Sequence, residues 1–173
     1  MSRGHVQSLA STNLVIEQAN TVFRNLGGMK FAALTAEAGF TAQPPSRHRG
    51  SALADLNGDG KLDVVVNALN APAEIWINQS PGANHWIEFK LQGTKSNRDG
   101  IGARIKVVTK SGAQYNHMTT SSGYASSSAG PVHFGLGTNA SVDILEIHWP
   151  SGVVQQMKDV AADRIVVVKE PEK

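Results

Sequence analysis

The stretch that decides the fold is residues 48–78, which read HRGSALADLNGDGKLDVVVNALNAPAEIWIN. A short apolar run ends at Ala54, a segment rich in Asp, Asn and Gly follows, and a second apolar run continues through residues 62–68. Asp, Asn and Gly are the residues that dominate turns. The pattern therefore predicts two strands joined by a tight polar loop.

The loop itself has the spacing of a calcium-binding loop. Oxygen-bearing side chains stand at positions 1, 3, 5 and 9 of the nine residues 55–63, and Gly60 stands where the chain must fold back. Ca²⁺ takes about six to eight oxygen ligands, and a backbone carbonyl can be one of them. We expect Ca²⁺ to be bound by Asp55, Asn57, Asp59, the carbonyl of Lys61, and Asp63.

Two alternatives to this calcium loop can be compared with it. An EF-hand needs a bidentate Glu at position 12, and that position is Val66, inside an apolar run. A turn that binds nothing would also be rich in Asp, Asn and Gly. Three carboxylates in one short loop repel one another without a cation, so the spacing favours metal binding.

Short apolar runs separated by turns extend on both sides of the loop. In residues 86–91, Ile87, Phe89 and Leu91 alternate with polar or amphipathic residues, which is the period of a strand. The same alternation recurs in residues 103–109. The expected strands are 21–26, 30–34, 51–55, 62–68, 74–78, 86–91, 103–109, 132–136, 142–149 and 164–169. This predicts an all-β fold, with only a weak helical pattern around residues 10–19.

A turn-rich stretch, QSPGANH at residues 79–85, predicts a domain boundary. We expect a first domain over residues 1–84, which contains the calcium loop, and a second over residues 85–173. The second segment is long enough for a small sandwich or barrel. Within it, the Ser-rich stretch 119–130 is expected to be an exposed loop.

The composition of the chain restricts the classes of partner that it can bind. The net charge is +2, the Lys and Arg residues are scattered, and there is no cysteine. Scattered charge is a weak basis for binding nucleic acid, and the basic strand 103–109 has too few aromatic residues to be a good stacking platform for RNA. No apolar stretch reaches the length of a membrane span, and the N-terminal residues have no secretory signal pattern.

No catalytic arrangement stands out. No two of the six histidines are spaced at i,i+2 or i,i+4, and no Gly-x-Ser-x-Gly elbow is present. The turn at residues 97–102 lacks the lysine of a phosphate loop. We therefore predict that the chain is not an enzyme.

Aromatic and basic residues are the candidates for contacts to a ligand. Aromatic faces suit sugars, and a Trp before a Pro-Ser-Gly turn can be partly exposed, although core packing is the favoured interpretation for the tryptophans. The candidates are Tyr124, Trp149, Arg98 and Arg104.

Residues 48–78 resemble an FG-GAP/VCBS repeat, the blade unit of β-propellers, whose Asp-x-Asn-x-Asp-Gly-x-x-Asp loop binds calcium. The second half resembles an ASPIC/UnbV domain, in the stretches GTKSNRDGIGARIKV (93–107), HFGLG (133–137) and VDILEIHWPSG (142–152). Together these resemblances imply terminal β-propeller blade strands followed by a small β-sandwich-like domain. They also imply that Asp55, Asn57, Asp59 and Asp63 bind Ca²⁺ through side chains and Lys61 through its carbonyl.

The resemblance further implies a calcium-binding, non-enzymatic module for adhesion or binding, extracellular or periplasmic, with a glycan or a protein as ligand. A structural or assembly module without a small ligand, or a weak RNA-binding β surface, is the alternative. A propeller needs several blades, so an isolated blade exposes sheet edges. We expect these edges either to pack against the second half of the chain or to form a homo-oligomer.

Overall fold

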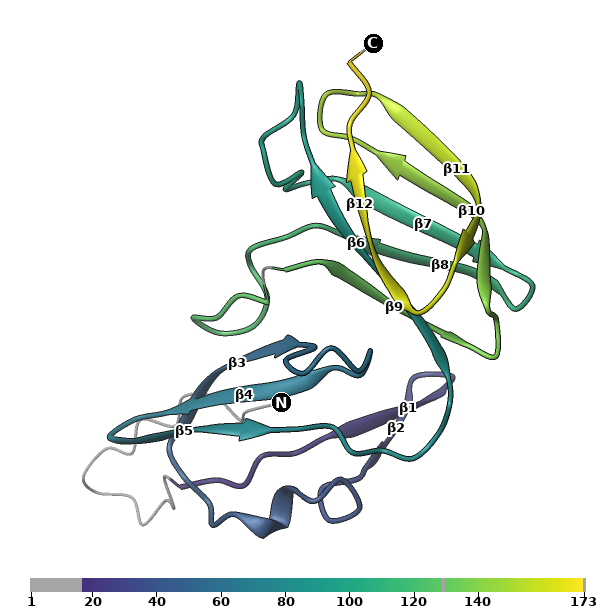
Figure 1. Ribbon diagram of the computed structural model, residues 1–173. Coiled ribbons are helices and arrows are strands. Elements are labelled where there is room, and N and C mark those ends of the chain that lie inside the picture. The colour runs from purple at the N-terminus through teal and green to yellow at the C-terminus, as the bar shows by residue number, and fades with distance from the viewer. Residues whose placement is uncertain (1–16, 129, 173) are drawn as a thin grey trace. The chain divides into compact units, whose positions relative to one another are not determined.

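The computed structural model describes residues 17–128 and 130–172 (Figure 1). This part of the chain forms twelve strands, and its one helical element is a 3₁₀ turn at Phe40–Ala42. The predicted all-β fold is confirmed. No helix among these residues has the length and apolar character needed to cross a bilayer. The weak helical pattern around residues 10–19 falls largely outside the described residues.

The contacts divide the chain into two units. The N-terminal unit consists of the residues up to Leu53, Asp63–Ile77 and Ser122–Ser127, and the C-terminal unit consists of Ala54–Leu62, Asn78–Ser121 and Ser128–Lys173. The sequence instead predicts one boundary between residues 84 and 85. The difference arises because the polar loop before Asp63 makes its contacts with C-terminal residues, as described below.

The N-terminal unit contains a hairpin and a small sheet. β1 (Phe23–Gly27) pairs with β2 (Lys30–Ala33) through a turn in which Gly27, Gly28 and Met29 have positive φ. β3 (His48–Ala54), β4 (Asp63–Ala68) and β5 (Ala71–Trp76) form a three-stranded sheet in the order β3-β4-β5. These are the predicted blade strands, and their ends differ from the prediction by a few residues.

The C-terminal unit contains two sheets. One has the order β11-β10-β7-β8 and the other β12-β6-β9, in which β12 runs parallel to β6 and β9 antiparallel to it. The strands are β6 (His85–Gln92), β7 (Arg104–Thr109), β8 (Gly112–His117), β9 (Val132–Gly137), β10 (Ser141–His148), β11 (Val154–Ala161) and β12 (Arg164–Lys169).

Alternating apolar residues of both sheets form one core. Ile87 and Phe89 of β6 and Leu145 and Ile147 of β10 are fully buried, and they belong to a single cluster. The rings of Phe89 and Phe134 meet edge to face, with centroids 5.8 Å apart. Two sheets that share a core make a sandwich, which agrees with the small β-sandwich-like domain expected in the second half of the chain.

The sequence does not predict two of the strands, β8 and β11. β8 reads GAQYNH and is exposed along its whole length, and β11 is mostly exposed. Both lie at the edges of the four-stranded sheet. Edge strands that bury little surface need few β-branched residues, so their sequences lack the pattern by which strands are found.

The last strand is fixed by a buried carboxylate. Glu170 follows β12 and is 1% exposed. One oxygen accepts hydrogen bonds from the backbone N–H groups of Thr94, Lys95 and Ser96 at 2.8–2.9 Å, and the other accepts from the hydroxyls of Ser96 and Ser151. Burial alone would raise the pKa of Glu170, but these hydrogen bonds outweigh it and lower the pKa to about 2.

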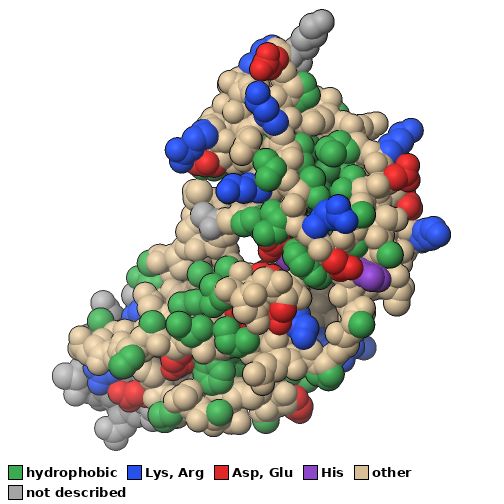
Figure 2. Space-filling view, viewed as in Figure 1, with side chains coloured by type: hydrophobic (Ala, Val, Ile, Leu, Met, Phe, Trp, Pro, Cys, Tyr) green, Lys and Arg blue, Asp and Glu red, His purple; other side chains and the backbone are tan. Residues whose placement is uncertain are grey.

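The N-terminal unit buries much less apolar surface. Phe31 is 60% exposed and Ile75 is 64% exposed, and hydrophobic side chains gather on the visible face of this unit in Figure 2. A polar network connects its strands instead. The Glu74 carboxylate accepts hydrogen bonds from Asn20 Nδ2 and Trp76 Nε1, both at 2.9 Å, and lies 2.7 Å from His48 Nε2.

Candidate metal-binding loop and the outer sheet face

The loop between β3 and β4 folds around its first carboxylate. Asp55 Oδ1 accepts hydrogen bonds from the backbone N–H groups of Gly58 at 2.7 Å and Asp59 at 3.2 Å, and Asp55 Oδ2 accepts from Gly60 N–H at 2.7 Å. Gly58 and Gly60 have φ of 77° and 83°, which glycine adopts without steric cost. The Asp at position 1 and the glycines thus determine the curvature of the loop.

The next two polar residues continue this curvature. The Asn57 side-chain oxygen accepts from Asp59 N–H at 3.2 Å, and the Asp59 carboxylate accepts from Lys61 N–H at 2.9 Å. The Lys61 N–H is the main cause of a lowered pKa at Asp59, which keeps this exposed carboxylate ionised. Asp55, Asn57 and Asp59 therefore present oxygens from three alternate positions of one turn.

Asp63 differs from the other three acidic or amide residues. It is the first residue of β4 and 1% exposed. A carboxylate removed from water needs a hydrogen-bonded or cationic partner. In the described part of the chain, no three Asp, Glu or His side chains converge as a metal cluster. Ca²⁺ binding would therefore also use the Asn57 amide and the Lys61 carbonyl, and these hard oxygens are the donor type that Ca²⁺ takes.

The loop packs on residues of the C-terminal unit. His133 Nε2 lies 2.9 Å from the carbonyl oxygen of Gly60, and a Cβ added to Gly60 would lie 1.9 Å from Trp86 Nε1. The Trp86 and His133 rings stack in parallel with centroids 6.3 Å apart. Gly60 therefore has two roles, a positive φ and direct contact with an indole. The spacing of the loop residues predicts the first role, and no sequence pattern indicates the second.

A buried acid lies near this contact. Glu88 is 5% exposed and pairs with His133 across β6 and β9. Desolvation raises the pKa of Glu88, the charge of His133 opposes this shift, and the charge of Asp55 adds to it. The first carboxylate of the loop is thus close enough to influence Glu88 electrostatically.

The candidate ligand contacts lie on different elements. Trp149 is 3% exposed, belongs to the core cluster and donates from Nε1 to Gln155 Oε1 at 2.9 Å. Its role as a sugar-stacking residue is therefore wrong, because the side chain packs between strands instead of facing water. Tyr124 is 51% exposed in the Ser-rich segment, which agrees with its expected exposure.

The two arginines are both accessible. Arg98 lies in the turn after β6, and its guanidinium pairs with Asp99 at 3.1 and 3.2 Å, which raises the pKa of Arg98. The turn is closed by Asn97, whose Oδ1 accepts from Ile101 N–H at 2.8 Å. The predicted turn at residues 97–102 is present, but a hairpin there is wrong, because the turn connects β6 to β7, which belong to different sheets. Arg104 lies on β7 and is exposed.

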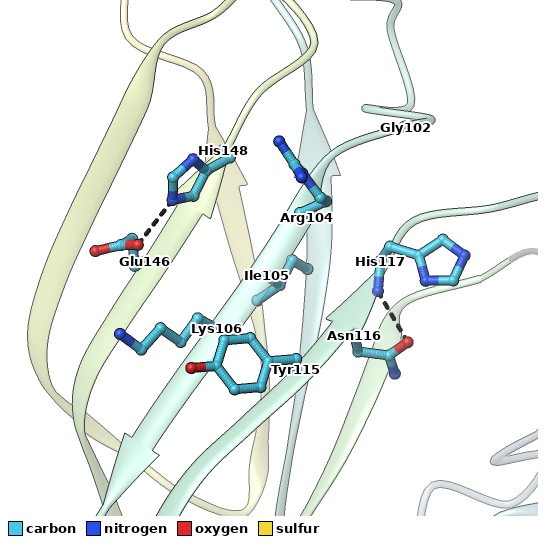
Figure 3. A pocket seen from close by; sticks show the side chains of 9 residues that line it. All are labelled: Gly102, Arg104, Ile105, Lys106, Tyr115, Asn116, His117, Glu146 and His148. Atoms are coloured by element: carbon cyan, nitrogen blue, oxygen red, sulfur yellow. Dashed lines mark hydrogen bonds and ion pairs between the residues drawn. The ribbon is translucent and has the colours of Figure 1, made fainter.

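Arg104 lines a shallow depression on the outer face of the four-stranded sheet (Figure 3). Its volume is about 690 Å³. The polar side chains around it are Arg104, Lys106, Tyr115, Asn116, His117, Glu146 and His148. Tyr115 is 73% exposed and was not among the predicted ligand contacts, because β8 itself was not recognised as a strand.

Comparison with known proteins relates both halves of the chain to described families. Residues 10–66 match the model of the FG-GAP-like repeat, and residues 93–173 match the model named ASPIC and UnbV. Cartilage acidic protein 1 of Xenopus tropicalis is 30% identical over 120 residues, which is 67% of this chain and 18% of that protein. The Mus musculus protein of the same name is 28% identical over 118 residues, 66% of this chain and 18% of its own length. The chain thus spans less than a fifth of the length of these relatives.

Proposed function

Because this chain belongs to the family that joins FG-GAP-like repeats to an ASPIC and UnbV domain, we propose that it is a calcium-binding, non-enzymatic binding module. We place it in an extracellular or periplasmic protein, and its ligand is a glycan or another protein. The name of the relatives, cartilage acidic protein 1, supports an extracellular location.

The observation that carries the calcium proposal is the loop at residues 55–63. Asp55, Asn57 and Asp59 present side-chain oxygens from alternate positions of one turn, and each of these side chains accepts a hydrogen bond from a backbone N–H group of the loop. Lys61 follows with a carbonyl and Asp63 with a buried carboxylate. Ca²⁺ bound there would relieve the mutual repulsion of the acidic side chains. It would stabilise the connection between β3 and β4, a structural role.

The expected affinity also agrees with an extracellular setting. Calcium sites in extracellular modules have dissociation constants on the order of 10⁻⁴–10⁻³ M. The loop offers two exposed side-chain ligands, Asn57 and Asp59, together with the half-buried Asp55 and the buried Asp63. Millimolar calcium would fill such a site, whereas micromolar calcium would leave it mostly empty.

The test is thermal unfolding of the chain with calcium and with a chelator. At 1 mM Ca²⁺ and a dissociation constant on the order of 10⁻⁴–10⁻³ M, a bound ion adds about 0.4–1.4 kcal/mol to the stability of the folded state. We therefore expect millimolar Ca²⁺ to raise the melting temperature, and Asp59→Ala to abolish this shift. Asp99→Ala is the matched control, because Asp99 is an exposed Asp in another turn, paired with Arg98. A melting temperature that changes neither with calcium nor with chelator would show that the loop is a turn that binds no calcium.

A second candidate, assembly through the N-terminal unit, has one specific observation in its favour. β3 and β5 are the two edges of a three-stranded sheet, and Ile75 on β5 is 64% exposed. Open edges with apolar side chains are surfaces on which other strands pair. Light scattering across a concentration series tests this candidate: Ile75→Lys should remove self-association, if the chain self-associates through this edge.

A further inference from the structure

The strand register arranges polar side chains in two rows across the outer face of the four-stranded sheet. In one row, His148 of β10 lies opposite Arg104 of β7, which lies opposite His117 of β8. In the next, Glu146 lies opposite Lys106, which lies opposite Tyr115. Residues directly opposite have Cα atoms about 4.5–5.5 Å apart, so each row is a continuous strip.

The one acidic group in these rows is already engaged. Glu146 Oε1 lies 2.7 Å from His148 Nε2, and Glu146 Oε2 accepts from Gln156 Nε2 at 2.7 Å. Both partners lie on the β10 and β11 side of Glu146. The hydrogen bonds from His148 and Gln156 lower the pKa of Glu146, so it stays ionised and bound to them.

The opposite side of the depression has cationic and aromatic groups without such partners. Among the described residues, neither the Arg104 guanidinium nor the Tyr115 hydroxyl makes a hydrogen bond to another protein group, and Tyr115 is 73% exposed. Figure 3 shows Arg104 beside His148 at one end of the depression and Tyr115 beside Lys106 at the other. Two permanent cations and one flat aromatic ring therefore face the same shallow space.

This combination fits an acidic sugar. A guanidinium donates two parallel hydrogen bonds to a carboxylate or sulfate, and an aromatic face packs on the apolar face of a sugar ring. The volume of about 690 Å³ lies within the range of sites for small ligands, and it is open on one side, as a site for part of a longer chain must be.

Single-stranded RNA fits less well. RNA-binding sheets stack successive bases on several aromatic rings along a basic groove. Here Tyr115 is the one Phe, Tyr or Trp side chain that lines the depression, beside the smaller rings of His117 and His148, and the Lys and Arg side chains are scattered in the view of Figure 2.

We propose that the outer face of β7, β8 and β10 is a binding site for an anionic saccharide, with Arg104 and Lys106 binding its acidic group and Tyr115 its ring. This proposal rests on the proposed function of the chain as a binding module and names the class of ligand. The acidic group is a uronate carboxylate or a sulfate, since a guanidinium recognises both the planar and the tripodal anion.

The experiment measures binding of the chain, in millimolar calcium, to four immobilised probes: hyaluronan oligosaccharides, heparin oligosaccharides, maltohexaose and poly(U) RNA. Hyaluronan has carboxylates and no sulfate, whereas heparin has both, so binding of heparin alone would indicate that sulfate is required; maltohexaose is a neutral sugar. We expect binding to at least one acidic saccharide, none to maltohexaose, and weakening by salt. Arg104→Gln should weaken binding about tenfold or more, since a charge-assisted hydrogen bond is worth roughly 1.5–3 kcal/mol. Tyr115→Ala should weaken it about fivefold.

Lys110→Gln is the matched control, because Lys110 is an exposed cation at the end of the same strand pair and does not line the depression. It should leave affinity unchanged beyond the small effect of net charge. Equal losses in Lys110→Gln and Arg104→Gln, unchanged binding in Tyr115→Ala and Arg104→Gln, or tighter binding of poly(U) than of either acidic saccharide would each overturn the site.

Failure of this site remains distinct from failure of the proposed function. The calcium shift in melting temperature depends on the loop at residues 55–63, and the variants of β7 and β8 lie outside that loop. If the calcium shift is present and no acidic saccharide binds, the saccharide site is wrong while the calcium-binding module stands.

Discussion

The C-terminal unit encloses sixteen apolar residues in one buried cluster, whereas among the described hydrophobic residues of the N-terminal unit only Phe40 and Val66 are buried. The units differ in architecture and not in composition alone. Two sheets that face each other can exclude water from the space between them, but one hairpin and one three-stranded sheet offer few opposed surfaces. Apolar residues in the N-terminal unit are therefore left at the surface.

The N-terminal unit compensates with polar contacts. Glu74 collects hydrogen bonds from Asn20, His48 and Trp76, which belong to three separate segments of that unit. Directional contacts of this kind are lost as a set when one member is removed. The C-terminal unit therefore depends on packing, whereas the N-terminal unit depends on individual hydrogen bonds.

The largest expected effect is the difference in stability loss between two Phe→Ala substitutions, one in each unit. Phe89→Ala removes a fully buried ring and should cost about 3–5 kcal/mol, because a cavity remains. Phe31→Ala, at a residue 60% exposed, should change stability by no more than about 0.5 kcal/mol. Urea unfolding measures both. A loss at Phe31 as large as that at Phe89 would mean that the apolar surface of the N-terminal unit is covered in solution.

The buried carboxylate of the C-terminal unit should show itself in the dependence of stability on pH. The pKa of Glu170 is lowered from 4.5 to about 2 in the folded chain. Its contribution to stability is therefore complete above pH 4.5 and is lost as the pH falls towards about 2. Glu170→Gln should lower the melting temperature at pH 7 by roughly 10 °C and flatten the pH dependence in this window.

Glu172→Gln is the control for this measurement, since Glu172 is exposed and pairs only with Lys169 at 3.5 Å. A pH profile of Glu170→Gln that parallels that of the unsubstituted chain would contradict the role assigned to Glu170.

In the N-terminal unit, the largest loss should come from the polar network. Glu74→Gln keeps the shape of the side chain but removes the charge that faces His48 and replaces one acceptor with a donor. We expect a loss of about 1–3 kcal/mol. Glu37→Gln, at an exposed residue, should change stability little. Urea unfolding measures both variants, and equal effects of the two substitutions would show that the network adds no stability.

The smallest expected effect is the difference in stability between alanine substitutions at two glycines of the loop. Gly58 and Gly60 both have positive φ, so alanine strains the backbone by about 1 kcal/mol at either position. Only at Gly60 would the added Cβ meet Trp86, whereas at Gly58 nothing lies within 4 Å. Gly60→Ala should therefore cost about 1–2 kcal/mol more than Gly58→Ala. Equal melting temperatures would show that the loop is not packed on Trp86 in solution.

The sequence could predict those features that depend on near neighbours along the chain. The alternation of Ile87, Phe89 and Leu91 identified β6 and its buried face, and the spacing of Asp55, Asn57 and Asp59 identified a loop that curves around its own carboxylates. The strands β8 and β11 could not be found in this way. They are stabilised by pairing with β7 and β10 and need little apolar patterning of their own.

Local periodicity and turn chemistry thus determined the all-β fold and the candidate calcium loop, because both follow from contacts a few residues apart. Only the tertiary structure decided that Trp149 is buried, that the loop at residues 55–63 packs on Trp86 and His133, and that Arg104, Lys106 and Tyr115 share one face. These arrangements depend on strand order and register between distant segments. Strand order and register are determined by the burial of apolar surface over the whole sheet, and no local sequence pattern contains this information.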